Sequence, residues 1–398
     1  MSRLIGTVSR GLRAPIIKSG DNLKEIVVNT VLDCEKNHDF EIKDKDVLAI
    51  TESILARSQG NYCSVDDIAK DVSNKLESDV IGLIFPITSR NRFSICLRGI
   101  ARGKKKIYLQ LSYPSDEVGN QLFDEELLYK TSINPYTEVL NEAKFTSLFG
   151  HSTHQFTGVN YVDYFREIIE GEDCEVEFIF ANNPRAILDY TTSVINCDIH
   201  TRNRTKKLLL DNGAKEVIGL ADIMNEPIDG SGYNKEYGLL GSNKATEETV
   251  KLFPNDSQKF VEEVQQAILD KTGKKIEVMV YGDGAFKDPV GKIWELADPV
   301  VSPGYTSGLV GTPNELKLKY LADDAYKELT GDELKEAIKD SIKQKDDELV
   351  GKMVSEGTTP RRLTDLIGSL SDLTSGSGDK GTPFIYISGY FDNYTNEE

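Results

Sequence analysis

The chain has 398 residues, of which 39% are hydrophobic and 28% charged, enough for two or three domains with sizeable cores. Its 65 acidic residues outnumber 47 basic ones, and the net charge of -18 disfavours general binding to nucleic acids. No apolar run approaches the roughly 20 residues that a membrane span needs, and the first residues lack the apolar core of a signal peptide. We therefore expect a cytoplasmic protein without a nucleic-acid or membrane partner.

Five cysteines and four histidines are scattered along the chain without a CxxC pair. An odd number of dispersed cysteines is typical of reduced thiols that serve as small packing residues. So few histidines disfavour a zinc site.

The first 130 residues alternate helical and strand patterns. Leu23, Ile26, Val27 and Val31 share one helical face after a polar start signal at residues 19–22. Residues 46–51 predict a short buried strand, and a second helix opens at Val65. Residues 93–97 and 106–111 predict two paired strands joined by a basic turn.

The composition changes near residue 130, where asparagine, tyrosine, threonine and glycine-bearing loops become more frequent. Strand patterns at 175–180 and 216–220 flank a helical pattern at 201–212. This alternation predicts an inserted α/β subdomain over residues 131–272 with its own small sheet. Residues 1–130 and 273–398 are then the two parts of one core.

The last part of the chain ends in a helix, a glycine-rich loop and a strand. A strand is expected at 275–281, a charged helix at 332–347 and a further helix at 361–372. The loop at 375–383 then leads into the apolar run 384–388. A helix, glycine loop and strand can present bare backbone N–H groups to phosphate oxygens, although an ordinary turn has the same pattern.

The strand at 46–51 leads directly into Glu52 and Ser53, followed by a turn that carries Arg57. Ligands of α/β proteins bind at the carboxyl ends of the strands, so hydroxyl and carboxylate groups there indicate a site. A helix cap followed by a surface arginine would give the same residues.

Five further stretches are dense in polar groups: residues 88–92, 113–120, 151–161, 197–204 and 357–362. Each can contact a ligand, and each can equally serve as a cap or solvated loop. In the second stretch, Asp116 could bind an amine or a metal or cap a helix. Cys197 and His200 do not form a nucleophilic site by this pattern, because nothing supplies an oxyanion hole or a third member.

Several of these segments resemble the family of coenzyme F420-0:γ-glutamyl ligases, in order and in spacing. The matching segments cover roughly residues 5–125 and 275–393: Gly11-Leu12, Pro15-Ile16-Ile17-Lys18, Glu52-Ser53 with Arg57 and Gly60, residues 109–116, and the glycine loop with the strand after it. The resemblance implies an α/β fold with mixed sheets and an intertwined homodimer.

The resemblance also implies an amide ligase that joins an acid to L-glutamate. In that family GTP phosphorylates a carboxylate with Mg²⁺ or Mn²⁺, and ATP is the alternative nucleotide here. Such chemistry needs hard oxygen ligands for the metal and cations around the phosphates. The residues carried over are Arg57, Asp283 and Lys287 as catalytic; Pro15, Ile16, Glu52, Ser53, Arg57, Gly376, Ser377, Gly378, Asp379 and Gly381 as nucleotide-binding; and Asp283, Asp288 and Asp116 as metal ligands.

The chain departs from the family at two acidic positions. Where the family has asparagine-alanine-glycine-isoleucine-aspartate, this chain has Leu97-Arg98-Gly99-Ile100-Ala101, so Ala101 replaces a metal ligand. Arg98, Arg102 and Lys104 supply positive charge there instead, and Ser377 stands at the acidic position of the C-terminal loop. Two alternatives follow: the same chemistry on an acid other than F420-0, or a non-catalytic nucleotide- or metabolite-binding protein that has lost its metal site.

Overall fold

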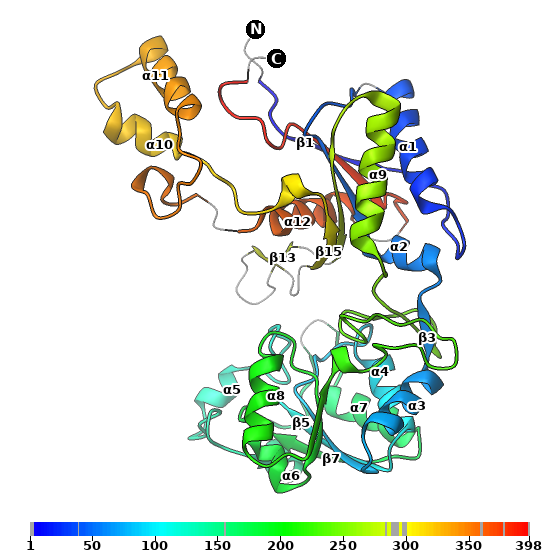
Figure 1. The fold of residues 1–398 in the computed structure, drawn as a ribbon. Coiled ribbons are helices and arrows are strands. Elements are labelled where there is room, and N and C mark those ends of the chain that lie inside the picture. Colours follow the sequence, from blue (N-terminus) through cyan, green and yellow to red (C-terminus); the bar gives the residue numbers. More distant parts are fainter. Residues whose placement is uncertain are drawn as a thin grey trace. The chain divides into compact units, whose positions relative to one another are not determined.

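The fold consists of two compact units, one inserted into the other. The computed structural model describes residues 4–38, 40–154, 157–282, 285–287, 294–296, 301–358, 361–376 and 379–396. Met1–Leu55 and Asp256–Glu398 form the first unit, and Ala56–Asn255 forms the second (Figure 1). Both units combine helices with a mixed sheet, which confirms the predicted α/β class.

The first unit is built on a five-stranded sheet in the order β1-β16-β2-β12-β15. β2 and β12 are parallel, and the other neighbouring pairs are antiparallel. The strands are β1 (Val8–Leu12), β2 (Val47–Thr51), β12 (Glu277–Gly282), β15 (Val301–Tyr305) and β16 (Phe384–Ser388). A separate hairpin joins β13 (Ala285–Lys287) to β14 (Trp294–Leu296).

Helices cover both faces of this sheet because its central strands are apolar on both sides. α1 (Leu23–Asn37) and α9 (Ser257–Thr272) cover one face, and α12 (Leu363–Ser375) covers the other. The side chain of Asn22 caps α1 by accepting from the Glu25 N–H. A smaller helical cluster around Leu321 and Ile338 contains α10 (Leu318–Tyr320), η4 (Leu321–Ala325) and α11 (Gly331–Lys343).

The second unit is built on a six-stranded sheet in the order β6-β7-β5-β4-β8-β9. All neighbouring pairs are parallel except β6 with β7. Its strands are β4 (Val80–Ile84), β5 (Lys106–Leu111), β6 (Leu140–Asn141), β7 (Glu175–Phe180), β8 (Ser193–Asn196) and β9 (Glu216–Gly219). β3 (Tyr62–Ser64), β10 (Asn243–Lys244) and β11 (Thr249–Lys251) form a small antiparallel sheet.

The helices of the second unit lie on both faces of its parallel sheet. One face packs on α3 (Val65–Lys75), α4 (Ser94–Arg102), α6 (Glu142–Phe149) and α7 (Tyr161–Glu170). The opposite face packs on η1 (Pro184–Asp189) and α8 (Arg202–Asp211). A capping box between Ser64 and Asp67 begins α3. The unit is therefore a doubly wound α/β sheet with an antiparallel edge strand.

The structure corrects one predicted pair of strands. Residues 106–111 are the predicted strand β5, but the predicted strand at 93–97 is the start of α4. The polar side chains Arg98 and Arg102 are four residues apart, so one helical face holds both, while Ile95, Leu97 and Ile100 are buried. A helix here also supplies the crossover that the parallel strands β4 and β5 require.

The structure divides the chain after Leu55 and after Asn255, whereas the sequence pattern gave boundaries at 130/131 and 272/273. The reason is strand pairing: β4 and β5 precede residue 130, but they pair with β7 and β8 in the second sheet. All five cysteines are free, and four of them are buried. No helix within the described residues is long and apolar enough to cross a bilayer.

Gly82 provides a test of the packing between β4 and η1. A Cβ at Gly82 would lie 2.4 Å from Ile187 Cγ1, whereas a Cβ at Gly219 in the same sheet would meet nothing closer than 3.5 Å. We expect Gly82→Ala to destabilise the protein by about 1–3 kcal/mol through overpacking, and Gly219→Ala to change it by under about 0.5 kcal/mol. Urea unfolding followed by circular dichroism measures both, and equal midpoints for the two variants would contradict the close packing.

Candidate functional site

Distant parts of the sequence meet at one edge of the first sheet. In the parallel pair, Thr51 at the end of β2 lies in register with Tyr281 near the end of β12. β16 runs the opposite way, so Phe384 at its start pairs with Ile50 on one side and with Leu12, the end of β1, on the other. We call this the first-sheet edge, and it gathers the loop that follows β1, the start of α2 (Glu52–Gln59) after β2, the end of β12 and the loop that precedes β16.

Hydrogen bonds join these loops to one another. The Ala14 N–H donates to the Gly381 carbonyl at 3.1 Å, and the Thr51 N–H donates to the Pro383 carbonyl at 3.1 Å. Thr382 Oγ1 donates to the Ser375 carbonyl at 3.0 Å, which ties the loop to the end of α12. The N-terminal and C-terminal segments that carry the family resemblance therefore share one edge.

Several predicted site residues follow β2 and β1 in the chain. Glu52 opens α2 (Glu52–Gln59) and is only 5% exposed, while Ser53 beside it is half-buried. Arg57 lies one helical turn further and is exposed; α2 itself runs across the division between the two units. Pro15 and Ile16 are exposed, Ile16 to 84%.

The C-terminal glycine loop begins where α12 ends. Gly376 is its C-cap with a φ of 60°, and Gly381 has a φ of 67°, so both adopt the left-handed conformation that glycine tolerates. Asp379 in this loop is exposed. Lys380 was not among the predicted site residues, yet its ammonium lies over Gly376, where an added Cβ would be 2.5 Å from Lys380 Nζ. The position of a lysine within a glycine-rich loop is the sequence feature that could have indicated this residue.

Four predicted site residues lie outside the described residues: Asp283, Asp288, Ser377 and Gly378. Asp283 directly follows Gly282, the last residue of β12. Lys287 ends β13, whose backbone comes close to α12.

Tyr281 lies beside these loops at the end of β12. Burial raises the pKa of Tyr281 to about 12, the Ser375 hydroxyl opposes this rise, and the Asp372 carboxylate adds to it. The phenol is therefore neutral at physiological pH and is 2% exposed. Because its hydroxyl has no hydrogen bond in good geometry with the described residues, a polar atom bound nearby would stabilise it.

The described residues contain no cluster of three histidine, cysteine or acidic side chains suited to a metal. Asp116, one predicted ligand, lies in the second unit. Its carboxylate accepts five hydrogen bonds, from Thr88 N–H and Oγ1, the Val118 N–H, and the Asn120 N–H and side-chain amide. Its oxygens therefore organise a turn.

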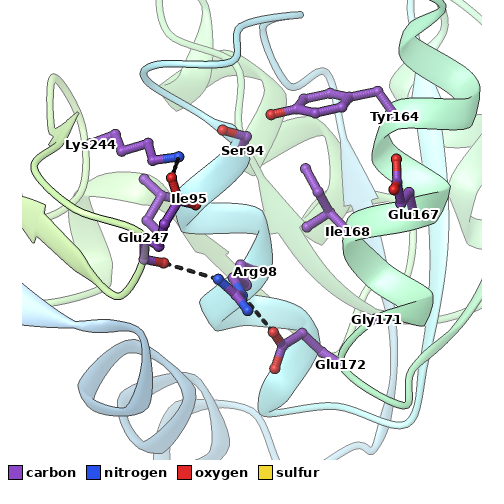
Figure 2. A pocket seen from close by; sticks show the side chains of 10 residues that line it. All are labelled: Ser94, Ile95, Arg98, Tyr164, Glu167, Ile168, Gly171, Glu172, Lys244 and Glu247. Atoms are coloured by element: carbon purple, nitrogen blue, oxygen red, sulfur yellow. Dashed lines mark hydrogen bonds and ion pairs between the residues drawn. The ribbon is translucent and has the colours of Figure 1, made fainter.

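The cations around Ala101 are also engaged within the second unit. Arg98 lines a pocket of about 300 Å³ between α4 and α7, shown in Figure 2. Its Nε donates to Glu172 at 2.6 Å and its Nη1 donates to the Glu247 carbonyl at 3.0 Å. Arg102 Nε reaches the other oxygen of Glu172 at 2.7 Å, and Lys104 Nζ donates to the Leu76 and Ser78 carbonyls.

Figure 2 shows that the remaining charges of this pocket are partly paired as well. Lys244 Nζ donates to the Glu247 carboxylate at 2.6 Å. Ala101, which lies in α4, is fully buried in the hydrophobic core of the second unit. These arginines and Lys104 thus hold helices together, and the structure gives them no phosphate-binding geometry.

The two mixed sheets define an α/β protein whose N-terminal and C-terminal segments meet at one sheet edge beside a buried carboxylate. A family model described as F420-0:Gamma-glutamyl ligase matches residues 11–389, and the chain belongs to this family. A comparison with curated proteins gives no match.

Glu172 tests whether the two arginines are structural. Burial raises the pKa of Glu172, but the hydrogen bonds from Arg102 and Arg98 outweigh it and hold the pKa below its ordinary value. We expect Glu172→Gln to lower the free energy of unfolding by about 1–3 kcal/mol at neutral pH, because both guanidiniums lose their shared carboxylate. Since the folded-state pKa is the lower one, this stability is complete above the unfolded pKa of about 4.3 and is lost as pH falls through the folded value.

Urea unfolding at neutral and acidic pH measures this contribution. The matched control is Glu170→Gln, an exposed glutamate 3.6 Å from Arg166, which should cost under about 0.5 kcal/mol. If the two variants lose equal free energies of unfolding, the arginine contacts of Glu172 are not structural. The same conclusion follows if the stability difference between Glu172→Gln and the unsubstituted protein is as large at acidic pH as at neutral pH.

Proposed function

We propose that this protein is a nucleotide- and divalent-metal-dependent amide ligase that adds L-glutamate, or a similar amino acid, to a carboxylate through an acyl phosphate. The observation that carries the proposal is the first-sheet edge, where the loop after β1 and the end of β2 meet the glycine loop before β16. The family match over residues 11–389 supports the γ-glutamyl ligase class. GTP is the proposed nucleotide, with ATP as the alternative.

The residues of the first-sheet edge have distinct proposed roles. The N–H groups of the loop from Gly376 to Gly381 would bind phosphate oxygens, and Arg57 and Lys287 would balance phosphate charge. Exposed Pro15 and Ile16 offer apolar surface for the nucleotide. Glu52 and Ser53 would complete the polar contacts at the end of β2.

A divalent cation would neutralise phosphate charge when bound. Glu52 is a nearly buried carboxylate at the first-sheet edge, and hard oxygen donors of this kind suit Mg²⁺ or Mn²⁺. Asp283 and Asp288 are the proposed ligands. Asp116 is left out of this set because its carboxylate already accepts five hydrogen bonds.

The proposed reaction has two displacement steps. A carboxylate oxygen of the acid attacks the γ-phosphorus, and the nucleoside diphosphate leaves, which gives an acyl phosphate. The amine of glutamate then attacks the acyl carbon, inorganic phosphate leaves, and the amine gives up its proton as the amide forms. Arg57, Lys287 and the loop N–H groups would hold the phosphoryl oxygens in both steps.

Two alternatives remain with this proposal. The same chemistry could act on an acid other than F420-0, since the inserted unit spans Ala56–Asn255. A non-catalytic nucleotide- or metabolite-binding role is favoured by one observation, the buried Ala101 at the family's metal-ligand position. A homodimer and a cytoplasmic location are proposed from the family resemblance and the composition.

Turnover assays distinguish these possibilities. Purified protein with GTP or ATP, Mg²⁺ or Mn²⁺, L-glutamate and F420-0 should release phosphate and form the glutamyl amide. Phosphate detection measures the first product, and mass spectrometry identifies the second. We expect Asp283→Asn to abolish turnover and Arg57→Ala to lower kcat/KM by about 10²-fold, because phosphoryl charge loses its balance. Lys271→Ala, an exposed cation at the end of α9, is the matched control.

The results of these assays distinguish the ligase proposal from its two alternatives. Phosphate release with a different acid but not with F420-0 would support the first alternative. Nucleotide binding without turnover in any combination of acid and metal would support the non-catalytic role. Full activity of Asp283→Asn would contradict the proposed site.

A further inference from the structure

The hydroxyl of Tyr281, near the end of β12, is buried without a hydrogen-bond partner. The residue is only 2% exposed, and its oxygen makes no hydrogen bond in good geometry with the described residues. A polar group buried in this way gives up its hydrogen bonds to water without replacing them, which lowers the stability of the fold. Because nearly all buried polar groups in native proteins are paired, an unpaired one at a candidate site indicates a contact that a ligand completes.

Other buried tyrosines of this chain do have partners. Tyr386, in β16, is completely buried and donates to the Asp46 carboxylate at 2.9 Å. Tyr113, in the second unit, is 1% exposed and donates to the Glu138 carbonyl at 3.1 Å. These phenols are as buried as that of Tyr281, so burial alone does not explain the missing hydrogen bond.

A second hydroxyl lies beside Tyr281 on the neighbouring strand. Thr51, the last residue of β2, is in register with Tyr281 in the parallel pair, so the two side chains extend to the same face of the sheet. This is the face covered by α12, because Val47 and Ala49, which alternate in phase with Thr51, belong to the same apolar cluster as Tyr281. No hydrogen bond joins the Thr51 hydroxyl to any residue in the described parts of the chain. Thr51 is partly exposed, and a ligand can therefore approach the two hydroxyls from the edge.

The phenol lies near the end of α12, where the electrostatic surroundings favour a cation. Burial is the largest cause that raises the pKa of Tyr281; the Asp372 carboxylate adds to it and the Ser375 hydroxyl opposes it, so both side chains are close to the phenol. α12 ends at Ser375, and a helix C-terminus carries a partial negative charge. One cation of the chain already lies there, since the ammonium of Lys380 is placed over Gly376, the C-cap.

An amino group fits these surroundings better than the other groups of the proposed reaction. A phosphate or carboxylate oxygen would meet the negative charge of Asp372 and of the helix end. Mg²⁺ prefers carboxylate and carbonyl oxygens, whereas a protonated amine has three N–H donors that neutral hydroxyl oxygens accept. Of the proposed reactants, the amino acid is the one that carries a protonated amine at neutral pH.

We propose that the hydroxyls of Tyr281 and Thr51 bind the amino group of the amino-acid substrate, L-glutamate. This inference rests on the proposed ligase function, because it gives a position to the amine that attacks the acyl phosphate. In the free protein the phenol of Tyr281 stays unpaired, and the substrate supplies the missing hydrogen bond when it binds. Neither residue was among the site residues predicted from the sequence.

The test combines Tyr281→Phe with a substrate analogue that lacks the amine. We expect the KM for L-glutamate to rise by about tenfold or more in the turnover assay with GTP, Mg²⁺ and F420-0, because one hydrogen bond to a charged group is lost. The KM for GTP should not change. Glutarate, which has both carboxylates of glutamate but no amino group, should inhibit the variant and the unsubstituted protein with the same Ki.

Tyr386→Phe is the matched control, because this phenol is equally buried in the same sheet but has Asp46 as its partner. Urea unfolding should show a lower midpoint for Tyr386→Phe, whose KM for L-glutamate should not change. Tyr281→Phe should behave in the opposite way. Its midpoint should equal or exceed that of the unsubstituted protein, because the substitution removes an unpaired polar group, while its KM rises.

Three results would overturn the inference. One is an unchanged KM for L-glutamate in Tyr281→Phe. Another is a Ki for glutarate that rises as much as this KM, because the hydroxyl would then act on something other than the amine. The third is a midpoint that falls as far as that of Tyr386→Phe, which would make the effect structural. The ligase proposal survives all three, since the unsubstituted protein still turns over, whereas a lack of turnover with every acid and nucleotide removes both proposals.

Discussion

The structure of the first unit depends on the central position of its last strand. β16 pairs with β1 on one side and with β2 on the other, and Phe384, Ile385, Tyr386 and Ile387 are completely buried. At the far end of the sheet, Tyr386 donates to Asp46 at 2.9 Å across 340 residues of sequence. Without β16, β1 would lose its only pairing partner among the described strands, and the glycine loop would not reach the ends of β1 and β2.

The insertion point of the second unit follows from the same sheet. β2 and β12 are parallel neighbours, so the chain between them must cross from one end of the sheet to the other. This crossover consists of α2, the whole of the second unit, and then α9, which packs on the sheet. The insertion begins at Ala56, within the same helix that starts with the candidate site residue Glu52. A crossover connection can lengthen greatly without changing a register in the sheet.

Local patterns predicted most individual elements but not their partners. The apolar spacing after Asn22 predicted α1, and the apolar runs predicted β2, β7, β12 and β16, because burial on both faces selects such runs. Residues 93–97 were mistaken for a strand because a short apolar run has no clear period. The helical period becomes visible only in the contacts that Arg98 and Arg102, four residues apart, make with Glu172. Which strands pair is decided by contacts far apart in the sequence, so the division at Leu55 could not be predicted from composition.

The same limit applies to the candidate site. Glu52 and the glycine loop could be singled out because they follow or precede a recognisable strand, yet their adjacency required the order β1-β16-β2. Lys380 was overlooked because its position over Gly376 depends on the path of the loop. The cations near Ala101 were expected to supply positive charge in place of the family's aspartate, whereas Arg102 and Arg98 pair with Glu172, which lies 70 residues beyond Arg102 in the chain.

The burial of Ala101 limits where a metal could be held under the proposed function. Ala101 is packed in α4 with no exposed surface, and a carboxylate there would lose its hydration without a partner. The local cations cannot compensate, because Arg98 and Arg102 are committed to Glu172 and Lys104 to backbone carbonyls. The ligands would then have to come from the first-sheet edge itself, where Glu52 already provides a nearly buried carboxylate and Asp283 follows β12. A metal site formed wholly by the first unit would leave the inserted unit free to acquire a binding role of its own.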